Sequence, residues 1–420
     1  MKLELKSIMG KINVLLIISL YFLLQSCYAT RAYKNRNFSL TDLDKLESVP
    51  LLPAEKPFEF AYTLSGQKAF TTFLDSNLEN TNTYSFLVIK NDSIVYEKYF
   101  DDVTETTKLP SFSVAKSFIG TLVQMAIEDG YIKSLQEPIT NYLGFLKDND
   151  NRFENITIQH VMNMASGIKN SENYSNPFGD VLHLGFTKNL YNQLKKLKIE
   201  ITPGNFDYKS VNTQLLAAII EVSTQQKVQD YFVKKIWYPL GMQYEATWNI
   251  DSKKHQLVRA FCCINAATKD FAKLGKLYLQ KGNYNDKQLI SEQYITNSTN
   301  SDSMQQNGGY KNQWWAGTPF VYFKDSLAAI NFITITPKTS FNKKILYKDV
   351  TYYSVKDELA PYYAEGILGQ FIYINPRTQT IIVRMGHYWK NKRYNSELSL
   401  IKASDNYLTR LLSNTNTDNN

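Results

Sequence analysis

The sequence predicts an α/β fold with two lobes: an antiparallel sheet flanked by helices, and a mostly helical second lobe. β-rich segments occur near both ends of the 420-residue chain, whereas the middle has helical periodicity. Hydrophobic residues make up 43% of the chain, enough to form a large core. We therefore expect strands from distant parts of the chain to pair in one sheet, and a ligand-binding cleft to lie between the two lobes.

The elements follow in order from local patterns. Strands Ser85–Lys90 and Ser93–Phe100 flank Asn91-Asp92, a pair typical of hairpin turns. Residues 113–129 form a helix with an apolar stripe. Further helices and strands are expected at Asn212–Ser223, Val228–Trp237, residues 268–278, Phe371–Ile374, Thr380–Arg384 and Ser396–Leu412.

The first residues have the pattern of a targeting segment. Three lysines precede the apolar run Val14–Leu24, which is about half the ~20 residues that a membrane-spanning helix needs. The run ends in Leu24-Gln25-Ser26-Cys27, which resembles the bacterial lipobox. We therefore expect cleavage after a signal peptide (1–26) and lipidation of Cys27, with an ordinary anchor helix as the alternative. Lipidation would hold the protein at a membrane of the bacterial cell envelope, on the periplasmic face or the cell surface.

The remaining chain is expected to form one large domain. Residues 27–80 are interpreted as a tether and wrapping segment, 81–412 as the domain itself, and 413–420 as a polar tail. The helical lobe should span about 136–259. The other cysteines, Cys262 and Cys263, are adjacent, and adjacent cysteines seldom bridge because their Cα atoms lie only ~3.8 Å apart. No disulfide is expected.

Several functional classes are poorly supported. The net charge is +8, but no long Lys/Arg run occurs, which indicates a basic surface rather than nucleic-acid binding. The four histidines form no HExxH pair, and neither a phosphate-binding glycine loop nor a G-x-S-x-G sequence is present. We therefore expect no metal or cofactor, and a hydrolase here needs a nucleophile whose base is not histidine.

Ser113-Val114-Ala115-Lys116 offers such a nucleophile. Positions i and i+3 share a helix face, so the Lys116 amine can approach the Ser113 hydroxyl. Lysine accepts a proton only when it is neutral, which requires burial or nearby positive charge to lower its pKa. The apolar neighbours of Lys116 make burial plausible.

Two further segments carry candidate groups. Tyr208 precedes a helix start and could relay a proton, although an aromatic packing role is the alternative. The segment Gly366–Gln370 leads into a strand, and a backbone N–H there can stabilise an oxyanion. A simple strand-entry turn is the alternative for this segment.

Together and in this order, the three segments resemble the serine β-lactamase/penicillin-binding-protein superfamily, and its class C-like branch in particular. The most similar group is the 6-aminohexanoate-dimer hydrolases and related envelope esterases. The resemblance covers roughly residues 80–410 and implies a β-lactamase/transpeptidase-like fold. Supporting stretches are Ile158–Gly167, Trp237–Met242, Trp314-Trp315 and the hairpin Gly369–Gly386.

The resemblance assigns roles to individual residues. It makes Ser113 the acyl-forming nucleophile, Lys116 its general base, and Tyr208 the tyrosine that assists proton transfer. The backbone amides of Ser113 and Ile367 match the oxyanion hole.

Three more residues are implied to contact substrate. Ser210 falls where this branch has a small polar residue, and Asn212 lies two positions further on. Tyr174 resembles a substrate-contacting tyrosine of the amide-hydrolysing members, with loop packing as its alternative.

The chain also departs from the family. Its third segment lacks the Lys-Thr-Gly or His-x-Gly of true β-lactamases and transpeptidases, which weakens a β-lactam assignment. The Lys- and Tyr-rich stretch Lys338–Tyr363 is hypothesised to be a lid or an exposed excursion. The leading hypothesis is an envelope serine hydrolase acting on small esters or amides. A peptidoglycan-directed DD-peptidase or D-amino-acid peptidase and an inactive envelope binding protein are the alternatives, and the oligomeric state stays open.

Overall fold

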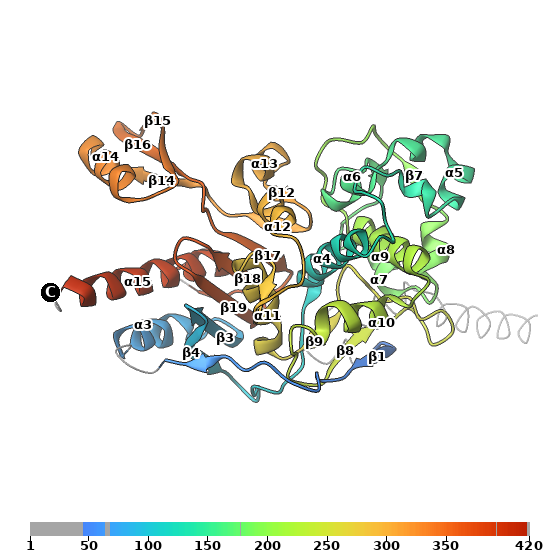
Figure 1. Ribbon diagram of the computed structural model, residues 1–420, viewed down its shortest axis with the longest axis horizontal. Coiled ribbons are helices and arrows are strands. Elements are labelled where there is room, and N and C mark those ends of the chain that lie inside the picture. The colour runs from blue at the N-terminus through green and yellow to red at the C-terminus, as the bar shows by residue number, and fades with distance from the viewer. Residues whose placement is uncertain (1–44, 64–67, 177, 392, 418–420) are drawn as a thin grey trace, which may run out of the picture.

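An eight-stranded sheet forms the first lobe (Figure 1). The computed structural model describes residues 45–63, 68–176, 178–391 and 393–417. The strand order is β12-β13-β17-β18-β19-β3-β4-β2, antiparallel throughout except for the parallel pair β2/β4. Their bounds are β2 (Ala61–Tyr62), β3 (Thr83–Lys90), β4 (Ser93–Tyr99), β12 (Tyr310–Lys311), β13 (Trp314–Ala316), β17 (Tyr362–Gly366), β18 (Gln370–Asn375) and β19 (Thr380–Gly386).

The sheet joins the two ends of the chain, as the sequence predicts. β3 pairs with β19, so that Val88 lies opposite Ile382. The predicted β3–β4 hairpin forms, and its turn residues Asn91 and Asp92 have φ of 47° and 65°. Such left-handed values at both turn positions match the right-handed twist of the paired strands.

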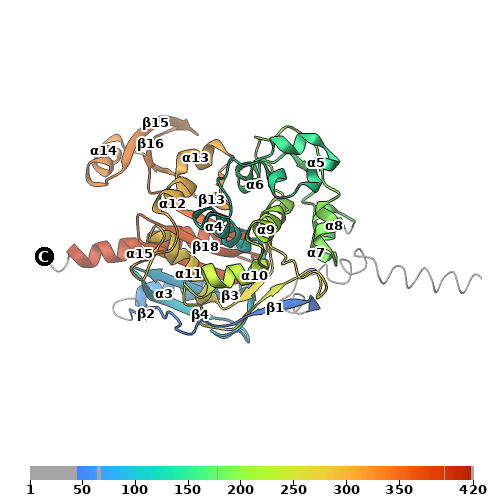
Figure 2. The same ribbon diagram turned by 45° about the vertical axis from the view of Figure 1, so that its right-hand side comes forward.

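Helices cover both faces of this sheet (Figure 2). Alternate residues of a strand point to opposite faces. In β3, Phe86 and Val88 therefore pack with α3 (Lys68–Leu78) and α15 (Glu397–Thr417), whereas Leu87 and Ile89 face the core that includes α11 (Thr268–Leu279). The last helix runs to Thr417, five residues past its expected end, so part of the segment interpreted as a polar tail is helical.

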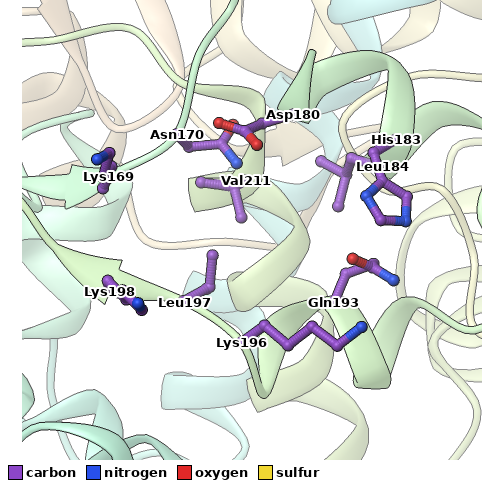
Figure 3. Close-up of a pocket in the computed structure, with 10 residues that line it drawn as sticks. All are labelled: Lys169, Asn170, Asp180, His183, Leu184, Gln193, Lys196, Leu197, Lys198 and Val211. Atoms are coloured by element: carbon purple, nitrogen blue, oxygen red, sulfur yellow. The ribbon is translucent and has the colours of Figure 1, made fainter. Parts of the chain in front are cut away.

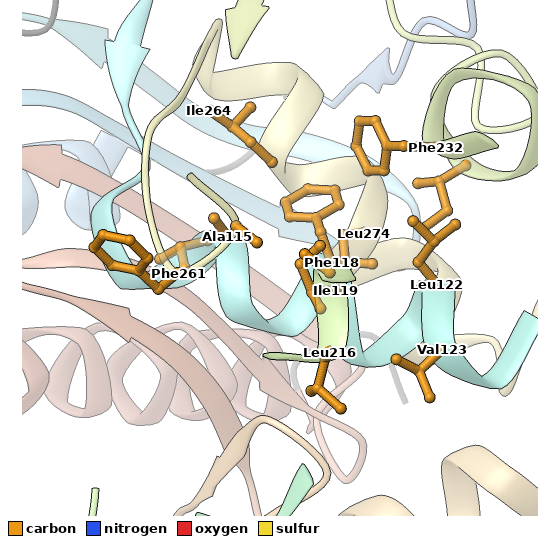
Figure 4. Close-up of a cluster of buried hydrophobic side chains, with 14 of the residues drawn as sticks. Ala115, Phe118, Ile119, Leu122, Val123, Leu216, Phe232, Phe261, Ile264 and Leu274 are labelled. Atoms are coloured by element: carbon orange, nitrogen blue, oxygen red, sulfur yellow. The ribbon is translucent and has the colours of Figure 1, made fainter. Parts of the chain in front are cut away.

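The second lobe is helical, as predicted, and α4 is its central helix (Figure 4). The side chains of Phe118, Ile119 and Leu122 on α4 are completely buried among residues of α9, α10 and α11. The helices of this lobe are α4 (Ala115–Glu128), α5 (Phe145–Asn149), α6 (Ile158–Met162), α7 (Asp180–Phe186), α8 (Leu190–Leu194), α9 (Ser210–Thr224) and α10 (Val228–Phe232). Shorter helical turns are η2 (Phe112–Val114), η3 (Ile139–Asn141), η4 (Asn151–Asn155) and η5 (Val233–Trp237).

A small sheet, in the order β1-β8-β9-β5, leads the chain to α4. β1 lies on its outer edge and pairs with β8. The strands are β1 (Ser48–Leu51), β5 (Leu109–Pro110), β8 (Ala246–Asn249) and β9 (Ile264–Ala266). Other short elements are β6 (Ile168–Lys169), β7 (Lys198–Ile199), β10 (Asn283–Tyr284), β11 (Lys287–Gln288), α12 (Glu292–Thr299) and α13 (Ser301–Gln306).

Between β13 and β17 the chain forms a separate projection, which we call the arm (residues 320–357) (Figures 1 and 2). It consists of β14 (Phe320–Phe323), α14 (Ser326–Ile335), β15 (Thr339–Tyr347) and β16 (Val350–Asp357). The stretch hypothesised to be a lid or an exposed excursion forms most of its sheet, and the arm points away from the body. Across the part of the chain that the structure describes, no helix is long and apolar enough to cross a bilayer. The predicted signal peptide and Cys27 lie outside the described residues.

Candidate active site

Ser113 lies at the junction between the small sheet and the central helix. β5 leads into η2, and η2 continues directly into α4. Phe112, the residue before Ser113, has φ of 41°, a left-handed backbone that costs a bulky residue on the order of 1–3 kcal/mol. Such strain is concentrated at functional sites, and here it lies directly beside the predicted nucleophile.

Lys116 is placed as the sequence predicts. Its Nζ atom lies 2.9 Å from Ser113 Oγ and donates a hydrogen bond to the Phe261 carbonyl at 2.8 Å. The side chain is buried, with 1% of the residue exposed. Burial lowers the pKa of Lys116 to about 7, while the carboxylate of Glu172 opposes the shift. Of the two causes that the sequence left open, burial is the one that operates, and it leaves much of the amine neutral near pH 7.

Tyr208 faces the same pair of groups. Its ring stacks on Trp315 with centroids 5.5 Å apart, and Lys116 Nζ lies 5.2 Å from the ring centroid. Burial raises the pKa of Tyr208 well above its usual value, although a hydrogen bond with the Ser113 side chain opposes the rise. The phenol therefore keeps its proton at neutral pH and can donate it to a neighbouring group.

Gly366 brings Ile367 next to the nucleophile. It ends β17 so close to η2 that an added Cβ would lie 2.7 Å from the Ser111 carbonyl oxygen and 3.1 Å from Ser113 N. Only glycine permits this approach. The following residue, Ile367, lines the same pocket as Ser113. This is the position from which its backbone N–H, together with that of Ser113, can stabilise an oxyanion.

Glu172 links Tyr174 to Ser210, and no sequence pattern predicted a role for it. Its carboxylate accepts hydrogen bonds from the Tyr174 hydroxyl at 2.8 Å, from the Ser210 backbone N–H at 2.8 Å, and from the Ser210 hydroxyl. Ser210 is the first residue of α9, where helix N–H groups lack partners and a negative charge is favoured. A lone acidic residue in an irregular loop carries no periodic signal that could have identified it.

Tyr174, Ser210 and Asn212, the three residues implied to contact substrate, lie in different positions relative to the pocket. Tyr174 is 37% exposed and lines the pocket beside Ser113. Ser210 and Asn212 are fully buried and do not line that pocket, which argues against direct contact with a ligand. Ser210 instead holds Glu172, and the Asn212 amide donates a hydrogen bond to Met164 Sδ at 3.5 Å.

An apolar pocket opens beside Ser113. Its volume is about 40 Å³, and no side chain that lines it is charged. The residues that form its walls include Phe112, Tyr174, Leu182, Phe186, Phe261 and Ile367. The pocket lies next to the nucleophile, so it is the space available to a group bonded to the reacting carbonyl.

Two cysteines complete this wall, and they correct a prediction. Cys262 and Cys263 line the pocket and form a disulfide with a Cα–Cα distance of 3.7 Å. The expectation that these cysteines do not bridge is therefore wrong. Cys263 has φ of 77°, and this left-handed backbone accompanies closure of the small ring between adjacent residues.

A second pocket, of about 200 Å³, has a different character (Figure 3). It lies beside α7 and α8 and is lined by polar and charged groups, which include Lys169, Asp180, His183, Gln193, Lys196 and Lys198. None of Ser113, Lys116 and Tyr208 lines it. The chemistry is therefore assigned to the apolar pocket.

Comparison with known proteins agrees with this geometry. Residues 73–402 match the family model described as Beta-lactamase. The 6-aminohexanoate-dimer hydrolase of Paenarthrobacter ureafaciens is 22% identical over 326 residues, which cover 75% of each chain.

Solved structures share the fold. A Bacillus anthracis protein, provisionally described as a 6-aminohexanoate-dimer hydrolase, superposes with a TM-score of 0.66 at 21% identity, covering 91% of this chain and 94% of the other. A penicillin binding protein from Bacillus halodurans gives a TM-score of 0.56 at 14% identity, covering 79% and 98%.

Proposed function

The chain belongs to the beta-lactamase family of serine hydrolases, and on that premise we propose that it cleaves esters or small amides through an acyl-enzyme on Ser113. One observation carries the proposal. The Ser113 hydroxyl lies 2.9 Å from a buried amine whose pKa is lowered to about 7. A serine hydroxyl is a weak nucleophile until a neighbouring base takes its proton, and Lys116 is such a base.

The arrangement supports a two-step reaction. Neutral Lys116 accepts the proton of Ser113 as Oγ attacks the substrate carbonyl, and the oxyanion forms beside the N–H groups of Ser113 and Ile367. Tyr208 donates its proton to the departing alcohol or amine and recovers one from Lys116. Water then attacks the ester on Ser113, with Lys116 again as the base, and releases the acid.

β-Lactams are expected to be poor substrates. The segment Gly366–Gly369 lacks the lysine or histidine that accompanies β-lactam recognition in related enzymes. Nitrocefin should therefore be hydrolysed slowly or not at all. Rapid turnover of nitrocefin or of a D-Ala-D-Ala peptide would instead favour the peptidoglycan-directed alternative.

We propose that the enzyme needs no metal or nucleotide and is anchored through a lipid on Cys27. Replacing this cysteine (Cys27→Ala) should leave an unprocessed precursor, because the lipobox cysteine is the site of both lipidation and cleavage. Processing of the wild-type chain at another position would contradict the anchor. Esterase activity should survive EDTA, and loss of activity that zinc restores would contradict the metal-free mechanism.

The central test is covalent labelling. A fluorophosphonate probe should modify Ser113, identified by peptide mass mapping, and Ser113→Ala should abolish the label. Ser175→Ala, which changes an exposed loop serine, is the matched control and should label normally. Absence of labelling in folded wild-type protein would favour an inactive binding protein.

A further inference from the structure

We propose that the apolar pocket beside Ser113 holds the acyl group of the substrate, and that this group is short and uncharged, with the Cys262–Cys263 disulfide forming part of its wall. The inference rests on the proposed acyl-enzyme function and specifies its substrate class. The pocket is placed to hold part of a bound substrate, because its walls include the nucleophile Ser113 and Ile367.

The acyl side of the substrate fits this pocket better than the leaving group. A leaving group must lie near the proton donor, and neither Tyr208 nor Lys116 lines the pocket. Tyr208 instead lies among Trp315 and Tyr310. The pocket therefore extends from the carbonyl on the side away from the proton relay.

The size and polarity of the pocket restrict the acyl group. A volume of about 40 Å³ is far below the ~300–1,000 Å³ of pockets for drug-sized ligands, so the pocket favours a short acyl chain. No charged side chain lines the pocket, and burying an unpaired charge is strongly unfavourable. A butanoyl group meets both conditions, whereas an acyl chain that ends in an ammonium would find no carboxylate among the residues that line the pocket.

The disulfide has two contacts in this arrangement. Cys263 is 3% exposed and packs with Phe112, the strained residue before the nucleophile. Phe261, directly before the bridge, supplies the carbonyl that accepts a hydrogen bond from Lys116. Bridged sulfurs carry no S–H donor, so they present an apolar wall where two free thiols would present donors. The bridge thus shapes the pocket and constrains the segment that holds the base.

The first experiment compares p-nitrophenyl butanoate with p-nitrophenyl 3-aminopropanoate at pH 7.5, because their acyl groups have equal numbers of heavy atoms. We expect kcat/KM to be at least about 100-fold lower for the charged acyl group. p-Nitrophenyl acetate measures the chemistry alone. If acetate turnover does not depend on Ser113, the proposed function fails. If acetate is hydrolysed through Ser113 and the two matched esters react equally, only the pocket assignment fails.

The second experiment changes the wall. Cys262→Ser/Cys263→Ser should lower kcat/KM for butanoate about tenfold relative to acetate, since the pocket gains two hydroxyls. An equal loss of kcat/KM for both esters would show that the disulfide only supports the structure and does not shape the pocket. Leu182→Ala leaves the bridge intact and enlarges the pocket, so the preferred ester should shift from butanoate toward hexanoate. An unchanged chain-length preference in folded Leu182→Ala protein would overturn the assignment.

A different observation carries a second inference, about the arm. Of the seventeen large hydrophobic side chains that are exposed in the described residues, nine lie between 321 and 350. Such a concentration of exposed hydrophobic side chains on one segment marks a surface that associates with another molecule or a membrane. Three of them lie on α14: Leu327, Ile330 and Ile335 are 62%, 58% and 79% exposed.

We infer that the arm inserts into the surface of an anionic membrane. The arm (residues 320–357) contains six lysines and three aspartates, so it carries net positive charge. Anionic lipid headgroups complement that charge, and acyl chains accept the apolar residues. A second copy of the arm would bring like charges together.

Bromolipid quenching tests this inference with the full chain reconstituted in phosphatidylcholine/phosphatidylglycerol vesicles. The added fluorescence of Ile330→Trp should be quenched by lipids brominated in their acyl chains. That of Tyr388→Trp, an exposed site outside the arm, should not. Equal quenching at both positions, or none at Ile330→Trp, would overturn the inference. So would a dimer in sedimentation that Leu327→Glu/Ile330→Glu dissociates.

Discussion

Two buried lysines of this molecule each have a polar partner three residues earlier in the chain, but the two partners give them different roles. Lys116, in the first turn of α4, has a serine three residues before it, and Lys273 of α11 has Asp270 at the same spacing. Both side chains are removed from solvent. Lys273 forms an ion pair with Asp270 at 2.9 Å and donates a hydrogen bond to the Gly241 carbonyl.

The difference lies in the partner at position i−3. Burial lowers the pKa of Lys273, and the Asp270 carboxylate counteracts that shift. Asp270 is in turn held by the backbone N–H groups of Gln243 and Tyr244. Lys116 has a neutral hydroxyl in the same position, and its pKa falls to about 7. The same burial thus yields a structural ion pair in one helix and a candidate base in the other.

The largest expected effect comes from removing the base. Lys116→Arg should reduce turnover of a p-nitrophenyl ester at least about 10⁴-fold, because arginine keeps its proton at accessible pH. Lys273→Arg is the matched control and should retain turnover per folded molecule. Steady-state kinetics on protein with native circular dichroism make this measurement. Near-wild-type activity of Lys116→Arg would show that Ser113 has another base.

The next effect concerns the proton relay. Tyr208→Phe keeps the aromatic stack on Trp315 but removes the hydroxyl, so turnover should fall about 10²–10⁴-fold. Stopped-flow measurement of p-nitrophenol release would locate the loss in the acylation step. A loss of less than threefold would assign Tyr208 to packing.

Replacing the two lysines by methionine should change the free energy of unfolding in opposite directions. Lys273→Met leaves Asp270 buried without its partner, so we expect a loss of about 3 kcal/mol in the free energy of unfolding. Lys116→Met removes an amine whose charged form is penalised by burial, so we expect a gain of about 1–3 kcal/mol at pH 7. Urea denaturation measures both. Destabilisation of similar size in both variants would remove the proposed distinction.

The smallest effect is a shift in pH dependence. kcat/KM should rise with pH through about 7 and then level off, because only the neutral amine accepts a proton. The carboxylate of Glu172 raises the pKa of Lys116, so Glu172→Gln should move the rise to lower pH by less than about one unit. Between the folded pKa of about 7 and the ordinary value of 10.5, the unfolded chain binds more protons at Lys116, so stability should increase with pH. A shift of the rise to higher pH in Glu172→Gln would contradict this electrostatic role.

The sequence located those parts of the site that depend on local spacing. Ser113 and Lys116 share a helix turn, and the glycine before Ile367 belongs to a hairpin, so neighbouring residues carry these signals. The same helical geometry explains the outcome at Asn212. Residues two apart on a helix do not face each other, so Asn212 cannot share the surface that Ser210 directs toward Glu172.

The features that sequence reasoning missed depend on contacts between distant segments. Glu172 reaches Ser210 across a loop. The close approach of Gly366 to Ser113 requires the sheet and the helical lobe to be assembled. The bridge between Cys262 and Cys263 depends on a backbone conformation that cysteine rarely adopts. The arm carries a mixture of apolar and basic residues that gives no indication of how far it projects.

The pairing of β3 with β19 also has a consequence for the order in which the protein is made. Val88 is synthesised long before its partner Ile382. β3 can pair early with β4, but its other edge has no partner until β19 is made, and folding that depends on such non-local pairing is slow. A chain that lacks β19 cannot join β3 to β18, the strand that pairs with β17, and Gly366 and Ile367 lie at the end of β17. The proposed hydrolytic activity should accordingly require that β19 is present and paired.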